Sequence, residues 1–388
     1  MVPIRYNFRS LAVRKATTLA TALGIGLVVF VLAVAMMLSN GIRKTLGASG
    51  HADVAIVLRK GSDNELGSTI EDAQVGVLTA LPQVKRGTDG APLSAAEVVV
   101  VTASEKIGAV GVTNLQIRGV TDDVLTFRPS VHVVEGRAPR PGADEAMVGQ
   151  RVRGRFRGMD LGQTFDIKKN RPVTVVGVFE DGGSSHESEV WVALDTVRSS
   201  FGRQGIRSAV RVRLTSPEAF ADYQRAVEQD KRIGLQAMRE TDFYEKQSEG
   251  TGLFISILGT LVSVFFSFGA VIGAAITMYA AVANRSREVG ILRALGFSRG
   301  AILFSFVSES VMLSLFGGLL GTVSSLALGG QKISMMNFAS WSEIVFSFEP
   351  TPGILVTGLL FSLAMGVVGG FLPALRAARV PPVAAMKG

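Results

Sequence analysis

Four long apolar segments constrain the fold of this chain more than any other feature of its sequence. The first runs from Ala16 to Leu38 without a charged residue, and the others occupy 251–283, 301–328 and 354–375. About 20 apolar residues in a helix suffice to cross the ~30 Å hydrocarbon core of a bilayer. The sequence therefore predicts an α-helical integral membrane protein with four transmembrane helices.

The first and second segments each leave a choice of interpretation. A cleaved signal peptide also begins with basic residues, but its apolar core is usually only ~7–15 residues, so 16–38 is expected to be an uncleaved span. The segment 251–283 is longer than a bilayer requires at 1.5 Å per residue. It must either tilt strongly or project beyond the membrane as a stalk.

Lys and Arg residues collect in three of the flanks of these segments, where acidic residues are rare. These basic residues are Arg5, Arg9, Arg14 and Lys15; Arg285, Arg287, Arg293 and Arg299; and Arg376, Arg379 and Lys387. Short basic flanks stay in the cytoplasm. We therefore expect both termini, including the tail 376–388, and the loop 284–300 to be cytoplasmic, with 39–250 and the loop 329–353 outside.

The tail before the first span has its own pattern. Ile4, Phe8 and Leu11 recur at helical spacing beside Arg5 and Arg9. Such a pattern is typical of a short amphipathic helix in the inner headgroup layer, here residues 1–15. A disordered basic tail is the alternative.

About 210 residues separate the first two spans, which predicts a large α+β extracytoplasmic domain inserted between them. Short β-branched runs typical of strands occur at 98–102, 173–179 and 190–194. We expect a larger subdomain over about 50–201 and a small βαβ-like subdomain over about 206–245. Alternating arginines at 151–157 predict a solvated strand face, or else a contact with anionic lipid or a partner.

Composition excludes several classes of protein. There is no cysteine, and the three histidines show no metal-ligand spacing, so we expect no disulfide and no metal site. The net charge of +8 could indicate nucleic-acid binding. Because the cations cluster beside the apolar segments, we interpret them as membrane flanks and expect no nucleic-acid partner.

Two sequence motifs bear on whether this chain is an enzyme. A phosphate-binding loop needs a lysine directly after a glycine, and no lysine in this sequence follows a glycine. The run Gly296–Gly300 matches the G-x-S-x-G pattern of hydrolases, but it lies in a predicted turn between helices, away from any histidine. Gly296 is better interpreted as a helix C-cap and Ser298 as the N-cap of the third span. We therefore expect a non-enzymatic chain.

The loop 284–300 is the most informative short segment. Its apolar residues fall in one stripe with charged residues along the border; the stripe is Val289, Ile291, Leu292, Leu295 and Phe297, and the border is Arg287, Glu288 and Arg293. A helix of about two turns with this pattern can lie on the inner membrane surface and dock into a groove of a soluble partner. An ordinary interfacial loop helix is the alternative.

The segment REVGILRALGFSRGAI resembles the coupling helix of the MacB/FtsX-type ABC transporter permeases. Further similar stretches follow in the order of that family: NFRSLAVRKATTLATALGIGLVVFVLA, VVEGRAPRPGADEAMVGQ, RPVTVVGVFED, LFGGLLGT and PALRAARVPPVAAMK. MacB itself carries a nucleotide-binding domain before its first span, which this sequence lacks. The resemblance thus implies a stand-alone permease of the type VII class in a bacterial inner membrane.

Several functional expectations come from this resemblance alone. It implies a dimer with a second copy or a paralogue, above separate ATPase subunits that bind ATP and Mg. The expected ATPase contact consists of Arg287, Glu288, Gly290, Leu292, Arg293, Leu295 and Gly296. Mechanotransmission to the periplasmic domain would export or extract lipoprotein, lipid, peptide or drug substrates, with membrane lipids, a periplasmic adaptor and an outer-membrane channel as candidate partners. The alternative is FtsX-like control of a cell-wall hydrolase.

Polar and small residues inside the spans predict helix contacts. Glu309 lies within the third span, where a charge is costly, so it should face protein and bond to a neighbouring helix or to a basic loop residue such as Arg293. A role in conformational switching is the alternative. The pairs Gly317/Gly321 and Gly366/Gly370 have the small-xxx-small spacing that allows close helix approach. They could lie at a dimer seam or inside the four-helix unit.

Overall fold

The computed structural model describes residues 15–108, 110–230 and 233–381, so the predicted helix over 1–15 lies outside them except for Lys15. The chain divides into two compact units. We call the first the helical unit; its described residues are 15–40, 253–331 and 347–381. The second, the β-rich unit, contains 41–252, apart from the undescribed positions, together with 332–346.

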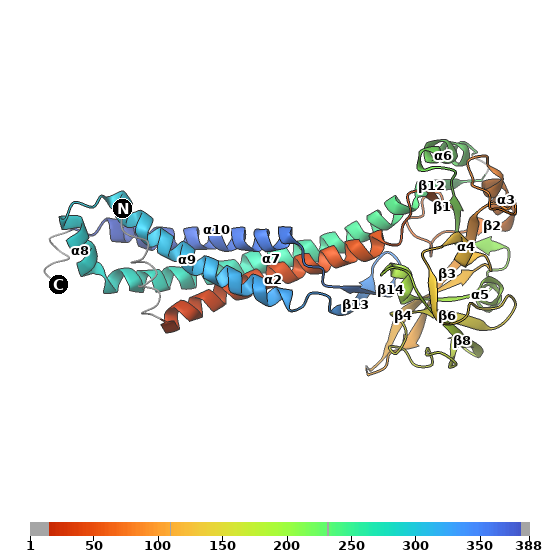
Figure 1. The fold of residues 1–388 in the computed structure, drawn as a ribbon, viewed down its shortest axis with the longest axis horizontal. Helices are drawn as coiled ribbons and strands as arrows, with labels where there is room; N and C mark the ends of the chain where they lie inside the picture. Colours follow the sequence, from red (N-terminus) through yellow and green to blue (C-terminus); the bar gives the residue numbers. More distant parts are fainter. Residues whose placement is uncertain (1–14, 109, 231–232, 382–388) are drawn as a thin grey trace. The chain divides into compact units, whose positions relative to one another are not determined.

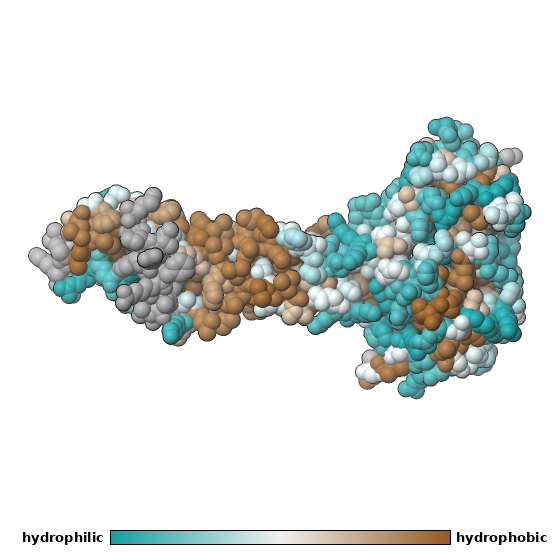
Figure 2. All heavy atoms as spheres, viewed as in Figure 1, coloured by the Kyte–Doolittle hydropathy of each residue, from teal (hydrophilic) through white to brown (hydrophobic). Residues whose placement is uncertain are grey.

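Four helices of the described chain are long and apolar enough to cross a membrane: α2 (Lys15–Gly47), α7 (Glu240–Asn284), α9 (Arg299–Leu326) and α10 (Pro352–Ala378). A short helix, α8 (Ser286–Ala294), lies between α7 and α9 (Figure 1). The surface of the helical unit is largely apolar, whereas that of the β-rich unit is largely polar (Figure 2). Of the four, α7 has 45 residues and begins eleven residues before the expected start at 251.

The helix of the last span, α10, continues through Pro373 and three residues past the predicted end at 375, to Ala378. A proline inside a helix loses one backbone hydrogen bond and its ring crowds the carbonyl of residue i−4. Here that residue is Gly369, which has no side chain to add to the crowding. Packing of Ala374 and Ala377 against α7 and α9 in a buried cluster also holds this turn in place.

Glycines of α9 allow it to contact α2 backbone to backbone. A Cβ placed on Gly317 would lie 2.5 Å from the carbonyl oxygen of Ala22, and one on Gly321 would overlap the carbonyl of Gly26. Gly26 is equally constrained, since a Cβ there would lie 2.9 Å from the oxygen of Gly317. The pair predicted from spacing thus packs inside the helical unit.

The glycine pair of α10 packs against two serines of α9. Side chains at Gly366 and Gly370 would overlap Ser314 and Ser310, respectively. The hydroxyl of Ser310 donates a 2.8 Å hydrogen bond to the carbonyl oxygen of Gly366. Both glycine pairs therefore have their close contacts within one copy of the chain, between neighbouring helices.

The β-rich unit is built on one large sheet with the strand order β12-β1-β11-β3-β4-β9-β6-β8-β5, and β7 pairs with β8. The strands are β1 (Val54–Arg59), β3 (Ser94–Glu105), β4 (Val112–Val120), β5 (His132–Gly136), β6 (Glu145–Gly149), β7 (Thr164–Lys168), β8 (Arg171–Glu180), β9 (Glu189–Ala193), β11 (Ala209–Arg213) and β12 (Leu235–Arg239). A small second sheet joins β2 (Ile70–Glu71) to β10 (Ile206–Arg207). The helices of this unit are α3 (Asp72–Ala80), α4 (Val124–Phe127), α5 (Leu194–Phe201) and α6 (Phe220–Gln229), with 3-10 turns at Ser185–Ser188 and Pro217–Ala219.

The predicted boundary near residue 201, which separates the larger subdomain from the small one, is wrong for β1. β1 lies between β11 and β12 and pairs with both in antiparallel register. Ala55 and Val57 of β1 and Leu78 of α3 share a buried core with Tyr223 of α6. The small subdomain therefore includes residues 54–84, which are distant in sequence and carried no local signal of this pairing.

The loop 329–353 contains a hairpin, formed by β13 (Lys332–Asn337) and β14 (Ser342–Ser347), most of which belongs to the β-rich unit. The backbone N–H of Val345 donates to the hydroxyl of Ser188 at 3.0 Å. The Asn114 amide donates to the carbonyl oxygen of Trp341 at 2.9 Å. The hairpin is thus hydrogen-bonded to the inserted domain.

The arginines at 151–157 do not form the strand that their alternation suggested. They lie in successive turns, in which Gly154 and Gly158 have positive φ angles of 70° and 77°. These left-handed conformations break the extended backbone that a strand requires. As a result, Arg151 is largely buried while Arg157 is exposed.

Candidate functional site

The short helix α8 is delimited by local backbone chemistry. It ends at Ala294, and Gly296 follows with a φ of 95°, a conformation that glycine adopts without strain. Ser298 then caps α9, its hydroxyl accepting a hydrogen bond from the backbone N–H of Ala301. The N-cap predicted at Ser298 is confirmed, whereas the C-cap of α8 is Leu295 and Gly296 is the residue after it.

One face of α8 packs into the helical unit. Val289 and Gly290 are buried, and Leu292 and Phe297 contact the same apolar cluster. The other members of this cluster come from the ends of the three long helices that follow or precede the loop: Met278, Val282, Ile302, Phe306, Ala374, Ala377 and Ala378. Movement of α8 would therefore disturb α7, α9 and α10 together.

The opposite face of α8 is exposed. Arg287 and Glu288 lie on this face, next to Ile291 and Leu295, whose exposed fractions are 46% and 72%. Two exposed aliphatic side chains bordered by charges form a surface that a partner protein could cover. The sequence pattern places Ile291 in the apolar stripe of this loop, but the family resemblance does not include it among the expected contact residues.

The predicted contact residues therefore divide between the two faces. Arg287, Glu288, Leu295 and Gly296 are exposed, whereas Gly290 and Leu292 face inward. Arg293 is half-buried, and its guanidinium donates to the carbonyl oxygen of Phe297 at 3.1 Å. Arg293 thus supports the turn after α8.

Glu309 forms an ion pair with Arg285 and not with Arg293, the partner suggested from the sequence. The Nη1 of Arg285 lies 2.9 Å from the Oε2 of Glu309, and both side chains are more than nine-tenths buried. The Arg285 guanidinium also lies 5.4 Å from the centre of the Phe306 ring and 3.3 Å from a carboxylate oxygen of Glu288. The residue preceding α8 is thereby fixed to the middle of α9.

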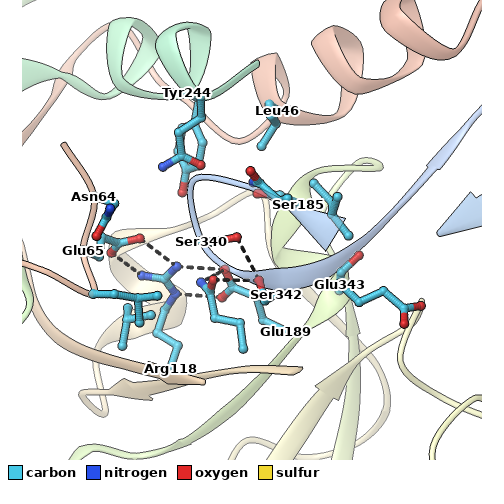
Figure 3. Close-up of a pocket in the computed structure, with 17 residues that line it drawn as sticks. Leu46, Asn64, Glu65, Arg118, Ser185, Glu189, Tyr244, Ser340, Ser342 and Glu343 are labelled. Atoms are coloured by element: carbon cyan, nitrogen blue, oxygen red, sulfur yellow. Dashed lines mark hydrogen bonds and ion pairs between the residues drawn. The ribbon is translucent and has the colours of Figure 1, made fainter. Parts of the chain in front are cut away.

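A second feature is a buried charge cluster in the β-rich unit, which the sequence did not reveal. Its members come from strands, loops and the first turn of α7: Glu65, Glu97, Arg118, Arg128, Glu189, Arg211 and Glu240. In Figure 3, Arg118 lies between Glu65 and Glu189, with Ser342 of the hairpin beside them. Each of these charged groups is almost fully buried.

The geometry of this cluster connects the sheet to the start of α7. A carboxylate oxygen of Glu97 lies 2.8 Å from Nη1 of Arg118 and 2.5 Å from Nη1 of Arg211. The Nε of Arg211 is 2.8 Å from Oε1 of Glu240, the first residue of α7. Arg128 approaches both Glu97 and Glu240, at 3.6 and 3.4 Å. The first turn of α7 is thereby joined to β3 and β11.

The arginines keep these buried carboxylates ionised. Burial alone would raise the pKa of Glu97, but the guanidinium groups of Arg211 and Arg118 more than offset this and hold it below its usual range. The pKa of Glu65 is lowered for the same reason, by Arg118 and Arg211. Because every charged residue of the cluster except Glu189 has at least two partners of opposite sign, we interpret the cluster as a structural connection between the sheet and α7.

Nearby, Asp181 and His186 predict how this unit responds to acid. Burial alone would raise the pKa of Asp181, but hydrogen bonds from His186 and Ser184 hold it at about 2, below the usual 3.8. A lowered carboxyl pKa contributes stability above the unfolded value, and this contribution is lost as the pH falls through the folded value. The near-ultraviolet circular dichroism of Trp191, whose ring is 5.8 Å from that of His186, should persist at pH 5. It should decline between about pH 4 and 2; a loss near pH 6.5 would contradict this assignment.

Neither the helix α8 nor the buried charge cluster has the geometry of a catalytic or metal centre. Within the described residues, no group of His, Asp or Glu side chains could hold a metal ion. The cavity beside Arg118 is small, about 30 Å³. The exposed face of α8, with Ile291 and Leu295 beside Arg287 and Glu288, has the composition of a protein contact.

The helices and the inserted α+β unit define a multi-pass membrane protein, and comparison with known families identifies its class. Residues 16–230 match the MacB-like periplasmic core domain, and residues 260–382 match the FtsX-like permease C-terminal domain. The chain belongs to the MacB/FtsX-type family of ABC transporter permeases.

Individual relatives show how much of the chain is shared. It is 28% identical over 405 residues to the macrolide export ATP-binding/permease protein MacB of Burkholderia orbicola (strain AU 1054), covering 96% of this chain but only 55% of that protein. It is 26% identical over 407 residues to the uncharacterized ABC transporter permease YknZ of Bacillus subtilis (strain 168), covering 99% and 98%. The chain thus spans about half the length of the MacB relative and nearly all of YknZ. A solved structure of the extracellular domain of YknZ covers 48% of this chain and aligns over 99% of its own length, with 17% identity and a TM-score of 0.36, too low to support a statement about the fold.

Proposed function

We propose that this chain is a permease subunit that receives movement from a separate ATPase at α8 and passes it to the β-rich unit. The observation that carries the proposal is the two-sided character of α8. One face exposes Arg287, Ile291 and Leu295 to a partner, while the other packs against α7, α9 and α10. A force applied to the exposed face would therefore be transferred to the spans.

The length of α7 and its attachment to the sheet support transmission of movement from α8 to the β-rich unit. It is a single helix of 45 residues, or about 67 Å at 1.5 Å per residue, which is about twice the hydrocarbon thickness. Its first residue, Glu240, bonds to Arg211 of the sheet, and its last, Asn284, is two residues before α8. In this mechanism α7 transmits movement of α8 to the sheet.

The orientation, the location and the partners belong to the same proposal. Both termini and α8 would face the cytoplasm, because Lys and Arg dominate those flanks. The β-rich unit would lie in the periplasm of a bacterium, beyond its inner membrane. The permease would act as a dimer with a second copy or a paralogue above two ATPase subunits that bind ATP and Mg.

Export or extraction of lipoproteins, lipids, peptides or drugs is the transport role that we propose for this chain. Control of a periplasmic partner such as a cell-wall hydrolase is the regulatory alternative implied by the FtsX resemblance. Purification of the full chain in mild detergent separates the two roles. An adaptor and an outer-membrane channel in the complex would support transport, whereas a bound hydrolase would support regulation.

The double substitution Arg287→Glu with Leu295→Glu tests the α8 contact. It should weaken binding of the ATPase that co-purifies with the wild-type chain by at least about thirtyfold, because two central contacts of an interface typically contribute ~1–2 kcal/mol each. Binding is measured by titrating the purified permease with that ATPase. Neither side chain lies in the packed face of α8, so the permease should remain folded.

The matched control is Lys60→Glu with Val77→Glu. Both positions are exposed in the β-rich unit, and the two changes alter charge and hydropathy in the same way. The control should bind the ATPase normally. Equal binding by the wild type and the α8 variant would contradict the proposed docking surface.

A further inference from the structure

A basic pocket of about 440 Å³ lies in the β-rich unit, between β13 and the turns after β6. Its lining contains Lys106, Gln150, Arg151, Arg153, Arg155, Lys332, Ile333, Ser334 and Val345. Five of these side chains are cationic, and no carboxylate is among these described lining residues. The pocket is therefore suited to an anionic ligand.

Carboxylates behind the pocket wall balance only part of this charge. Glu187 lies 2.9 Å from Nε of Arg151, and Glu135 forms an ion pair with Arg153. Glu343 forms ion pairs with two cations, Lys106, at 3.1 Å, and Arg155. Three carboxylates thus pair with four of the five cations, and the fifth, Lys332, is exposed at the pocket wall.

The excess of positive over negative charge affects Arg151 most directly. Its side chain is only 9% exposed, and it donates a 2.5 Å hydrogen bond to the carbonyl oxygen of Val345. Burial lowers the pKa of this guanidinium, and the single carboxylate of Glu187 does not offset the effect. A second anion in the pocket would restore the lost electrostatic stabilisation.

Exposed apolar side chains occur on the two hairpins that contribute to this pocket. On the β13–β14 hairpin they are Ile333, Met336, Phe338 and Trp341, with exposed fractions of 38–57%. At the β3–β4 turn, next to Lys106, Ile107 is 54% exposed and Val110 is completely exposed. Aromatic and aliphatic residues beside Lys and Arg are the composition found where proteins meet the lipid headgroup layer.

Chain connectivity adds a reason to consider lipid. Lys332 follows the last residue of α9, Leu326, by six positions, and Ser347 precedes the first residue of α10, Pro352, by five. Six extended residues reach at most about 20 Å. The covalent chain therefore keeps this hairpin near the ends of two membrane-length helices.

We propose that the pocket binds the phosphate of an anionic phospholipid at the membrane surface on the side of the β-rich unit. Arg151, Arg153 and Lys332 contact the phosphate, and Ile107, Phe338 and Trp341 enter the headgroup layer beside it. The inference is independent of the ATPase contact at α8. An experiment can disprove the lipid site while the ATPase contact at α8 is confirmed.

Native mass spectrometry of the delipidated full chain in mild detergent tests this site. Phosphatidylglycerol, phosphatidylcholine and inorganic phosphate are added in separate titrations, and apparent dissociation constants are taken from the adduct intensities. We expect saturable binding of phosphatidylglycerol that is several-fold tighter than that of phosphatidylcholine. The variant Arg153→Gln with Lys332→Gln should bind phosphatidylglycerol about thirtyfold more weakly, since each cation near a lipid surface contributes ~1 kcal/mol.

Two comparisons make the result decisive. The control Lys60→Gln with Lys169→Gln removes two exposed cations elsewhere in the β-rich unit and should bind phosphatidylglycerol like the wild type. Equal losses in both variants would overturn the assignment of the site. Inorganic phosphate that binds as tightly as the lipid and displaces it would show a site for a free anion, which also overturns the proposal.

Discussion

Replacing Glu97 with alanine is expected to lower the free energy of unfolding of the β-rich unit by about 3–5 kcal/mol. Glu97 is fully buried, and its carboxylate is the shared partner of Arg118 and Arg211. Removing it leaves those guanidinium groups buried with too little negative charge. Denaturant unfolding followed by the fluorescence of Trp191, which is fully buried in this unit, measures the loss.

Glu105→Ala is the matched control, because Glu105 lies on the same strand, β3. Its ion pair with Arg157 spans 3.3 Å, but the two side chains are 62% and 82% exposed. Exposed pairs contribute about 0–1 kcal/mol, so this variant should remain close to the wild type. Similar losses in the two variants would mean that the buried cluster contributes little to stability.

The Glu97 variant also bears on force transmission. Arg211 bonds to both Glu97 and Glu240, so loss of the first carboxylate alters the charge balance around the first turn of α7. Under the proposed function, a variant that still binds ATPase but has lost this connection should hydrolyse ATP without productive movement of the β-rich unit.

The second large effect is expected for Gly321→Val in α9. Any Cβ at this position overlaps the backbone of Gly26, and a backbone cannot move aside as a flexible side chain can. The helices α2 and α9 must separate, at a cost of about 3 kcal/mol, the upper part of the range for overpacking. A lower melting temperature of the full chain in mild detergent should result.

Gly273→Val on α7 is the control for this substitution. It introduces the same side chain into a helix of the same unit, and a Cβ at Gly273 would meet no atom within 4 Å. Its melting temperature should change by much less. A Gly321 variant as stable as the Gly273 variant would contradict the close α2–α9 contact.

The parts of the fold that sequence predicts are those with a local physical cause. An uncharged run such as 16–38 has few alternatives to a membrane-length helix, and Gly296 with Ser298 marks the turn before α9 by short-range backbone chemistry. The amphipathic pattern of 284–300 likewise predicted a short helix there. Its contact with an ATPase remains a prediction.

The parts that sequence does not predict depend on residues far apart in the chain. The pairing of β1 with β11 joins segments more than 150 residues apart, and no pattern at 54–59 indicates that partner. Glu309 was expected to have a partner, but nothing in the sequence distinguished Arg285 from Arg293 in the same loop. The buried cluster is equally non-local, since Glu97 and Arg211 resemble ordinary surface residues in sequence.

The β13–β14 hairpin determines which segments of the chain can be exchanged between members of this family. A chimaera that transplants residues 41–252 from a homologue would leave the host hairpin against a foreign surface, without its hydrogen-bond partners Asn114, a donor, and Ser188, an acceptor. Lys106 and Glu343, which pair across the same surface, would also be separated from their native counterparts. Residues 332–346 should therefore be inherited and engineered together with the long insertion, although about 80 residues of membrane helices and loop lie between them.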